Sequence, residues 1–98
     1  MNGERWTAAD VLEARATASF CARVILDGEV GGVGYDPYRD GKAGEKGPFQ
    51  LLPRGELRTF YARAYTDPHD PWQSLHFTEQ RLREGGGSAW TTAPRGCR

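Results

Sequence analysis

Residues 28–50 decide the organisation of the chain, and they read GEVGGVGYDPYRDGKAGEKGPFQ. An acid, Glu29, stands where a helical pattern ends, and the glycines after it let bare backbone come close to a ligand. A proline, an aromatic residue and a glutamine at positions 48–50 then restart regular structure. For a lone glutamate, a solvated surface loop is the alternative interpretation. The order of the residues instead indicates one wall of a functional site.

The segment before this stretch has the pattern of an amphipathic helix. Thr7 and Asp10 form a capping-box pattern, and apolar residues follow at alternating spacings of three and four. This periodicity predicts one helix from Thr7 to about Asp27. The helix is expected to be weakest at residues 17–19, where hydroxyl side chains compete for backbone hydrogen bonds and could divide it in two.

The end of this helix determines the chemistry expected of the acid. Gly28 is expected to cap the helix, which leaves Glu29 just past the last turn, close to the negative pole of the helix. A carboxyl group held partly out of water at such a pole has a raised pKa. A raised pKa is what a general acid working near neutral pH needs.

The remainder of the chain predicts a hairpin and two further helices. Residues 34–47 contain the turn residues of a small, irregular hairpin. A helix is predicted for residues 55–64. Asp70 and Pro71 supply the N-cap and the first position of a third helix, which is expected to end at the glycines of residues 85–87.

The length of the chain allows one small core. With 98 residues and 38% hydrophobic residues, we expect a single folded domain over residues 1–98. The tail after the last helix is irregular, with Trp90 as its expected anchor. The predicted fold class is therefore α+β, mainly helical, with a glycine-rich irregular hairpin.

Composition and charge exclude several classes of function. Thirteen basic residues balance thirteen acidic ones, so nothing favours a nucleic-acid partner. No apolar run has the length of a membrane span, and the first residues lack the pattern of a signal peptide. His69 and His76 form no recognised zinc spacing with either cysteine, and no phosphate-binding or nucleophile-elbow motif occurs. We expect no cofactor and no metal.

The central stretch resembles the lysozyme-like family of peptidoglycan-cleaving enzymes, which includes lytic transglycosylases, small phage muramidases and resuscitation-promoting factors. The matching positions are Glu29, Pro37, the run Gly47-Pro48-Phe49-Gln50, and Ser88 to Trp90 near the C-terminus. Val30 departs from the serine of many members, and the glycines that follow it lengthen the spacing to the proline. The resemblance implies a small lysozyme-like domain that cleaves the β-1,4 bond between N-acetylmuramic acid and N-acetylglucosamine.

The resemblance also implies roles for carboxyl groups, with Glu29 as the general acid. Glycoside cleavage usually uses a second carboxyl as base or nucleophile, and the candidates are Asp36, Asp40 and Glu45, of which Glu45 is preferred. Lytic transglycosylases manage with a single glutamate, so both mechanisms stay open. A monomer acting on glycan strands is expected, and without an export signal it would reach the wall by lysis, virion delivery or release from a longer parent.

Aromatic residues are the expected sugar-stacking groups, because sugar rings have apolar faces. For most of them core packing is the alternative, and Tyr35 and Tyr38 are the exceptions because they lie in a glycine-rich loop. Gln50 could hold an N-acetyl carbonyl group or order the loop backbone. The candidates for substrate binding are Tyr35, Tyr38, Phe49, Gln50, Tyr61, Trp72 and Trp90.

Small members of the family related to resuscitation-promoting factors tie the catalytic helix to the tail by a disulfide. Cys21 lies about two helical turns before the acid on the same face, and Cys97 follows Trp90, so a similar bridge is expected here. Two free thiols are the alternative. For the whole protein, the alternatives to an enzyme are a catalytically silent glycan-binding or structural module of a larger assembly, such as a virion, and a protein-interaction domain.

Overall fold

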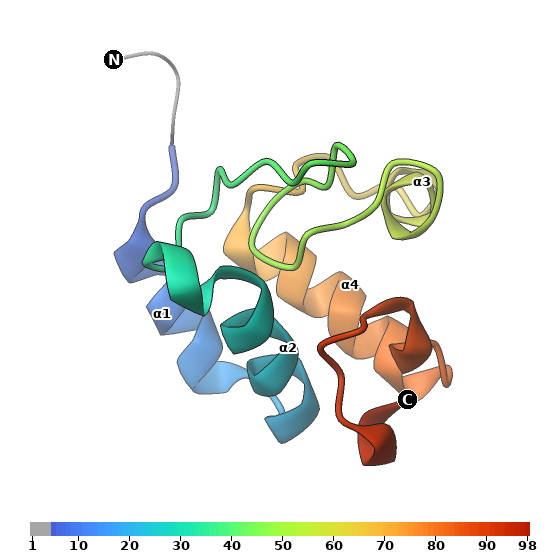
Figure 1. Cartoon of the computed structure of the whole chain (residues 1–98). Coiled ribbons are helices and arrows are strands. Elements are labelled where there is room, and N and C mark those ends of the chain that lie inside the picture. Colours follow the sequence, from blue (N-terminus) through green and yellow to red (C-terminus); the bar gives the residue numbers. More distant parts are fainter. Residues whose placement is uncertain (1–4) are drawn as a thin grey trace.

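Four α-helices supply most of the regular structure in the computed structural model, which describes residues 5–98 (Figure 1). Three short 3₁₀ turns follow or connect them. The helices are α1 (Ala8–Thr17), α2 (Phe20–Val30), α3 (Glu56–Ala62) and α4 (Pro71–Arg83), and the 3₁₀ turns are η1 (Gly31–Val33), η2 (Gly87–Ala89) and η3 (Arg95–Cys97). No helix among the described residues has the length and apolar character that crossing a membrane requires.

The core forms where α4 contacts both α1 and α2. Loop residues complete it, because Phe49, Leu51 and Trp90 are almost fully buried against the helices. Burial of large apolar side chains of this kind contributes roughly 1.5–3 kcal/mol for each residue. The expectation of a small, mainly helical domain is confirmed.

The β part of the predicted class is reduced to two isolated bridges. Lys46 pairs antiparallel with Asp40 on one side and with Leu51 on the other. Over residues 5–98 these pairings do not extend into a strand. The predicted hairpin is therefore a loop with two points of pairing, and we call residues 31–50 the glycine-rich loop.

The prediction of one continuous helix from Thr7 to Asp27 is wrong, and the alternative of a division at residues 17–19 is confirmed, because the chain forms two helices with a break at Ala18 and Ser19. Ala18 is extended, and the Ser19 hydroxyl accepts a hydrogen bond from the backbone of Ala22 as the N-cap of α2. The carboxylate of Glu79, on α4, accepts hydrogen bonds from the backbone N–H and the hydroxyl of Ser19. The expected capping box of Thr7 and Asp10 is present at the start of α1.

The expected end of the helix is also corrected. Gly28 lies inside α2, and Glu29 belongs to its last turn rather than to the residues after it. The helix continues because Val30 is fully buried, and the chain turns away only at Gly34, which has a φ of 70°. The start of α4 is as predicted, with Pro71 at the first position and Asp70 accepting two backbone hydrogen bonds.

Gly47 joins the glycine-rich loop to the segment before α4. Its φ is 80°, and a Cβ atom at this position would lie 2.0 Å from the carbonyl oxygen of Pro68. Gly34 also has a positive φ, but a Cβ there would meet nothing within 4 Å. A substitution at Gly34 therefore tests the backbone conformation alone, whereas a substitution at Gly47 tests the backbone conformation and the close packing together.

We predict that Gly47→Ala destabilises the fold by about 2–3 kcal/mol more than Gly34→Ala does, because only the former forces two backbones apart. Gly34→Ala is expected to cost roughly 1–2 kcal/mol for the left-handed conformation alone. Urea unfolding of both variants beside the wild type measures the difference. Equal losses of stability in the two variants would contradict the close approach at Pro68.

Candidate active site

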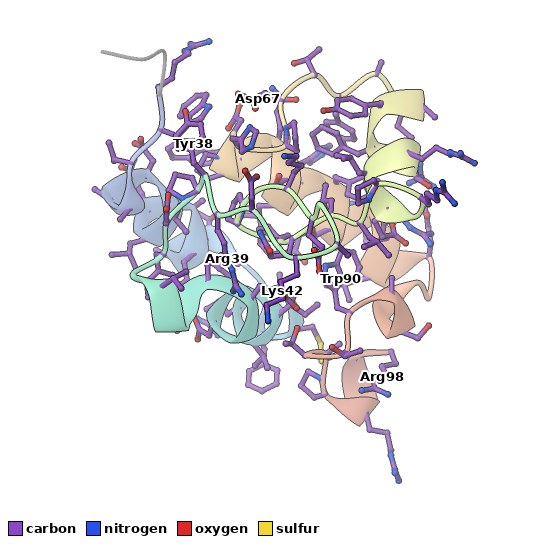
Figure 2. The ribbon with its side chains drawn as sticks, turned by 45° about the horizontal axis from the view of Figure 1, so that its top comes forward. Tyr38, Arg39, Lys42, Asp67, Trp90 and Arg98 are labelled. Carbon is purple, nitrogen blue, oxygen red and sulfur yellow. A yellow bond between two sulfur atoms is a disulfide. The ribbon has the colours of Figure 1, made fainter. Side chains whose placement is uncertain are left out.

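Glu29 lies half-buried in the last turn of α2, between the glycine-rich loop and the C-terminal tail. Its Oε2 atom accepts a hydrogen bond of 2.8 Å from the Thr92 hydroxyl. The guanidinium group of Arg39 donates to its backbone carbonyl, and Figure 2 shows this side chain extending from the loop toward α2. Arg39 thereby satisfies one of the carbonyl groups that a helix end leaves without a partner.

The environment raises the pKa of Glu29. Loss of water around the carboxyl group is the largest cause, and the nearby charge of Glu45 acts in the same direction. The Thr92 hydrogen bond and the positive charge of Arg39 favour the carboxylate and oppose the increase. The balance leaves a carboxyl group that holds its proton to a higher pH than an exposed glutamate does.

Of the three candidates for a second carboxyl, Glu45 is the one whose charge affects Glu29. Its Oε1 atom accepts a 2.9 Å hydrogen bond from the backbone of Ala43 and lies over Gly41, where a Cβ atom would be 2.2 Å away. Asp36 instead caps a local turn by accepting from the backbone of Tyr38. Asp40 forms an ion pair with Lys46 at 3.1 Å.

We predict that Glu45→Gln lowers the pKa of Glu29, because the amide keeps the oxygen that accepts from Ala43 but removes the negative charge. Carbon-detected NMR of the Glu29 carboxyl group across a pH titration measures the change. Glu13→Gln, an exposed position on α1, is the matched control and should leave the titration unchanged. A Glu29 pKa that stays the same or rises in Glu45→Gln would contradict the electrostatic coupling.

Phe49 and Trp90 belong to the core rather than to a substrate groove. They are only 2% and 3% exposed, which leaves no ring face open for a sugar. The Trp90 indole N–H donates to the carbonyl oxygen of Phe49 at 2.9 Å, so the pair fastens the tail to the glycine-rich loop. Their sequence positions match the family pattern, and their contribution is to packing.

The three tyrosines among the substrate-binding candidates lie in different surroundings. The Tyr35 hydroxyl donates to Asp27 on the outside of α2. Tyr38 stacks on His69 with the ring centres 5.0 Å apart, and its hydroxyl accepts from two backbone N–H groups of residues 5–6. Tyr61 on α3 is 50% exposed. Tyr61 also has an edge contact with the ring of Phe60, and none of these contacts of the three rings involves Glu29.

Gln50 orders the loop backbone. Its amide nitrogen donates to the carbonyl oxygens of Arg39 at 2.9 Å and of Gly47 at 2.8 Å, and the residue is buried. Both amide hydrogens are thus engaged within the glycine-rich loop. Of the two roles considered for Gln50, these contacts support the organisation of the loop that carries Arg39 and Glu45.

A disulfide joins Cys21, at the start of α2, to Cys97 near the C-terminus, with 5.6 Å between the Cα atoms. It draws the tail along α2, as Figure 1 shows, and brings Thr92 to the acid at the other end of the same helix. Sequence reasoning missed Thr92 and Arg39, because neither belongs to a motif. In the sequence, the expected disulfide between Cys21 and Cys97 was the one feature that indicated that the tail lies beside α2.

A cavity of about 730 Å³ lies at the opposite end of α2 from Glu29. Its walls come from the junction of α1 and α2 and from α4, and they include Trp72, which is 37% exposed. Trp72 thus faces this cavity rather than the acid. The lining residues are Thr17, Ser19, Cys21, Trp72, Leu75, His76, Glu79, Leu82 and Arg83.

Around Glu29 the structure therefore combines a half-buried acid of raised pKa, a hydroxyl that holds one of its oxygens and a second carboxylate on the facing loop. Such an arrangement can deliver a proton to a leaving oxygen atom. Among residues 5–98 no cluster of three metal-ligating side chains is found. Comparisons with protein-family models, with curated proteins and with solved structures found no match to this chain.

Proposed function

We propose that this protein cleaves the glycan strands of peptidoglycan at the β-1,4 bond between N-acetylmuramic acid and N-acetylglucosamine. The observation that carries the proposal is the Glu29 carboxyl group, half-buried at the end of α2 with a raised pKa and facing a glycine-rich loop. The resemblance to lysozyme-like enzymes in the order of residues 29–50 supplies the substrate. We propose a lysozyme-like arrangement for the domain on the same grounds.

In the proposed reaction, the protonated Glu29 gives its proton to the oxygen atom that links the two sugars. The bond from the muramic-acid C1 atom to this oxygen breaks, and the N-acetylglucosamine residue leaves with a new hydroxyl group. Positive charge develops on the muramic-acid ring at this stage. The carboxylate of Glu29 is then ready to act as a base in the second half of the reaction.

Two second steps are compatible with the site. In a transglycosylase, Glu29 takes the proton of the sugar's own C6 hydroxyl group as its oxygen closes an anhydro ring on C1. In a hydrolase, the oxygen of a water molecule bonds to C1 while the carboxylate of Glu45 takes one proton from that water. The charge of Glu45 acts on Glu29, which supports Glu45 as the second carboxylate of the hydrolase.

Digestion of purified bacterial sacculi with the wild-type protein tests the proposal. Release of soluble muropeptides is expected, and mass spectrometry of their reducing ends separates the two reactions because the anhydro product is lighter by one water. Wild-type protein that releases no muropeptides over a range of pH and wall types would overturn the assignment.

A catalytically silent glycan-binding or structural module is the second candidate. The observation in its favour is the burial of Phe49 and Trp90 and the separate contacts of the tyrosines, which leave few aromatic faces around Glu29. Co-sedimentation with intact sacculi without the release of soluble products would support this module. Release of products that depends on Glu29 would exclude it.

A further inference from the structure

The C-terminal residues 90–97, which we call the strap, are fixed at both ends. At one end Trp90 is buried and hydrogen-bonded to the glycine-rich loop. At the other end Cys97 is covalently joined to α2. Between them Ala93 is 2% exposed, and its carbonyl oxygen accepts from the side chain of Arg98. A segment held in this way presents its middle residues to α2 at a defined position.

The middle of the strap meets α2 at a glycine. A Cβ atom on Gly28 would lie 2.7 Å from two side-chain carbon atoms of Thr92, so no other residue fits without displacing the strap. A glycine inside a helix is unfavourable, since alanine is the better helix former. The close approach of Thr92 accounts for the presence of a glycine at position 28.

The contact made possible by this glycine is to the acid itself. Thr92 Oγ1 donates to Glu29 Oε2 at 2.8 Å, which fixes the rotation of the carboxyl group. Within the described residues, the other oxygen, Oε1, has no hydrogen-bond partner. One oxygen is therefore held and the other is left for a ligand.

From this geometry, and resting on the proposed function, we infer that Thr92 is the positioning residue of the general acid and that the strap exists to hold its hydroxyl against Glu29. Thr92 itself does not touch the reacting atoms. It acts through the direction in which the Glu29 carboxyl points and through the hydrogen bond that it gives to the carboxylate.

The charged groups that act on Glu29 are Arg39 and Glu45 of the glycine-rich loop, and neither is altered by a change at position 92. The Thr92 hydrogen bond favours the carboxylate, so its removal raises the pKa of Glu29. Because the acid must be protonated to act, the alkaline limb of the pH–rate profile then moves to higher pH. A purely structural role for Thr92 would lower activity without moving this limb.

The test is Thr92→Val, which keeps the shape of the side chain and removes the hydroxyl. We expect a higher Glu29 pKa by NMR titration and an alkaline limb shifted in the same direction. We also expect a loss in kcat on the order of tenfold, below the roughly 10²-fold that a 1 Å misplacement can cause. Thr92→Ser keeps a hydroxyl group and should restore the wild-type pKa of Glu29, the position of the alkaline limb and kcat. Thr91→Val, at the exposed neighbouring position, is the matched control.

Gly28→Ala reaches the same contact from the helix side, and its NMR titration is expected to move in the direction of Thr92→Val. The inference is overturned if Thr92→Val matches Thr91→Val within twofold in kcat and leaves the Glu29 titration unchanged. If the wild type itself cleaves no peptidoglycan, the proposed function fails. The NMR titration of Thr92→Val still decides whether the strap sets the proton affinity of Glu29.

Discussion

Glu29→Gln is expected to abolish the release of muropeptides, with a loss of at least about 10²-fold. The amide has nearly the same shape as the carboxyl group and can still accept the Thr92 hydrogen bond, but it has no acidic proton to give. Rates of muropeptide release from purified sacculi, compared with those of Glu13→Gln on the exposed surface of α1, measure the effect. Residual activity within tenfold of the wild type would remove Glu29 from the role of general acid.

The same variant has an expected effect on stability that shows whether the fold survives. Because the pKa of Glu29 is raised in the folded state, the folded protein binds a proton more tightly than the unfolded chain does. The stability that protonated Glu29 contributes is fully present at low pH, and it is lost as the pH rises through the pKa of Glu29 in the folded state. Glu29→Gln removes this decline, so its Tm at pH 7 should equal or exceed that of the wild type. A lower Tm would mean that any lost activity reflects damaged packing.

Removal of the disulfide is expected to cause a large loss of stability. The bridge closes a loop with a sequence separation of 76 residues. The chain-entropy relation gives about 4.5 kcal/mol for a loop of this size, and disulfides typically contribute about 2–4 kcal/mol. For a domain of this size, that corresponds to a fall in Tm of about 10 °C or more. The double variant Cys21→Ser/Cys97→Ser, followed by thermal unfolding, measures the loss without leaving one unpaired thiol.

The wild type treated with a dithiol reductant is the control for this variant. Its Tm should fall to that of the double variant, and the double variant should not respond to the reductant. Thiol titration of the unfolded, unreduced wild type should find no free thiol, since the described chain pairs Cys21 with Cys97. Two free thiols per chain would refute the bridge.

Features that depend on neighbouring residues were predictable from the sequence. The capping box of Thr7 and Asp10 and the N-cap of α4 at Asp70 are formed by side chains that bond to backbone within three residues. Their energies depend little on the rest of the fold. For this reason the starts of α1 and α4 lie where the pattern places them.

Features that depend on distant residues were not predictable in the same way. The sequence located the weak point at residues 17–19, but it did not show the contact that stabilises the break, because Glu79 is 60 residues away from Ser19 in the sequence. Gly28 has the local character of a helix end, yet it lies inside α2, where it packs closely against Thr92 of the tail and the helix continues to the buried Val30. Both results come from packing between elements, which overrides a local preference.

In the candidate site, too, some features could be predicted from nearby residues, whereas others depend on distant contacts. Glu29 could be selected as the candidate acid from the order of the residues around it, and its pKa is raised in the structure, with burial as the largest cause. The aromatic residues could not be divided into core and surface, because a Phe or Trp in a glycine-rich sequence can serve in either place. Phe49 lies in the core because the turn from Gly47 to Gln50 directs its side chain inward. Trp90 is buried beside it and donates a hydrogen bond to its backbone carbonyl.

The bond between Cys21 and Cys97 also changes what a protease can do to this protein. Every peptide bond between these two residues lies within one covalent ring, and the ring includes the exposed parts of the glycine-rich loop around Lys42. A single cut there opens the ring but leaves both fragments joined through sulfur. Because Ser19 of one fragment is also hydrogen-bonded to Glu79 of the other, a chain nicked at this site keeps its two fragments together by non-covalent contacts as well as by the disulfide. Only a second cut within the ring can release a peptide from it.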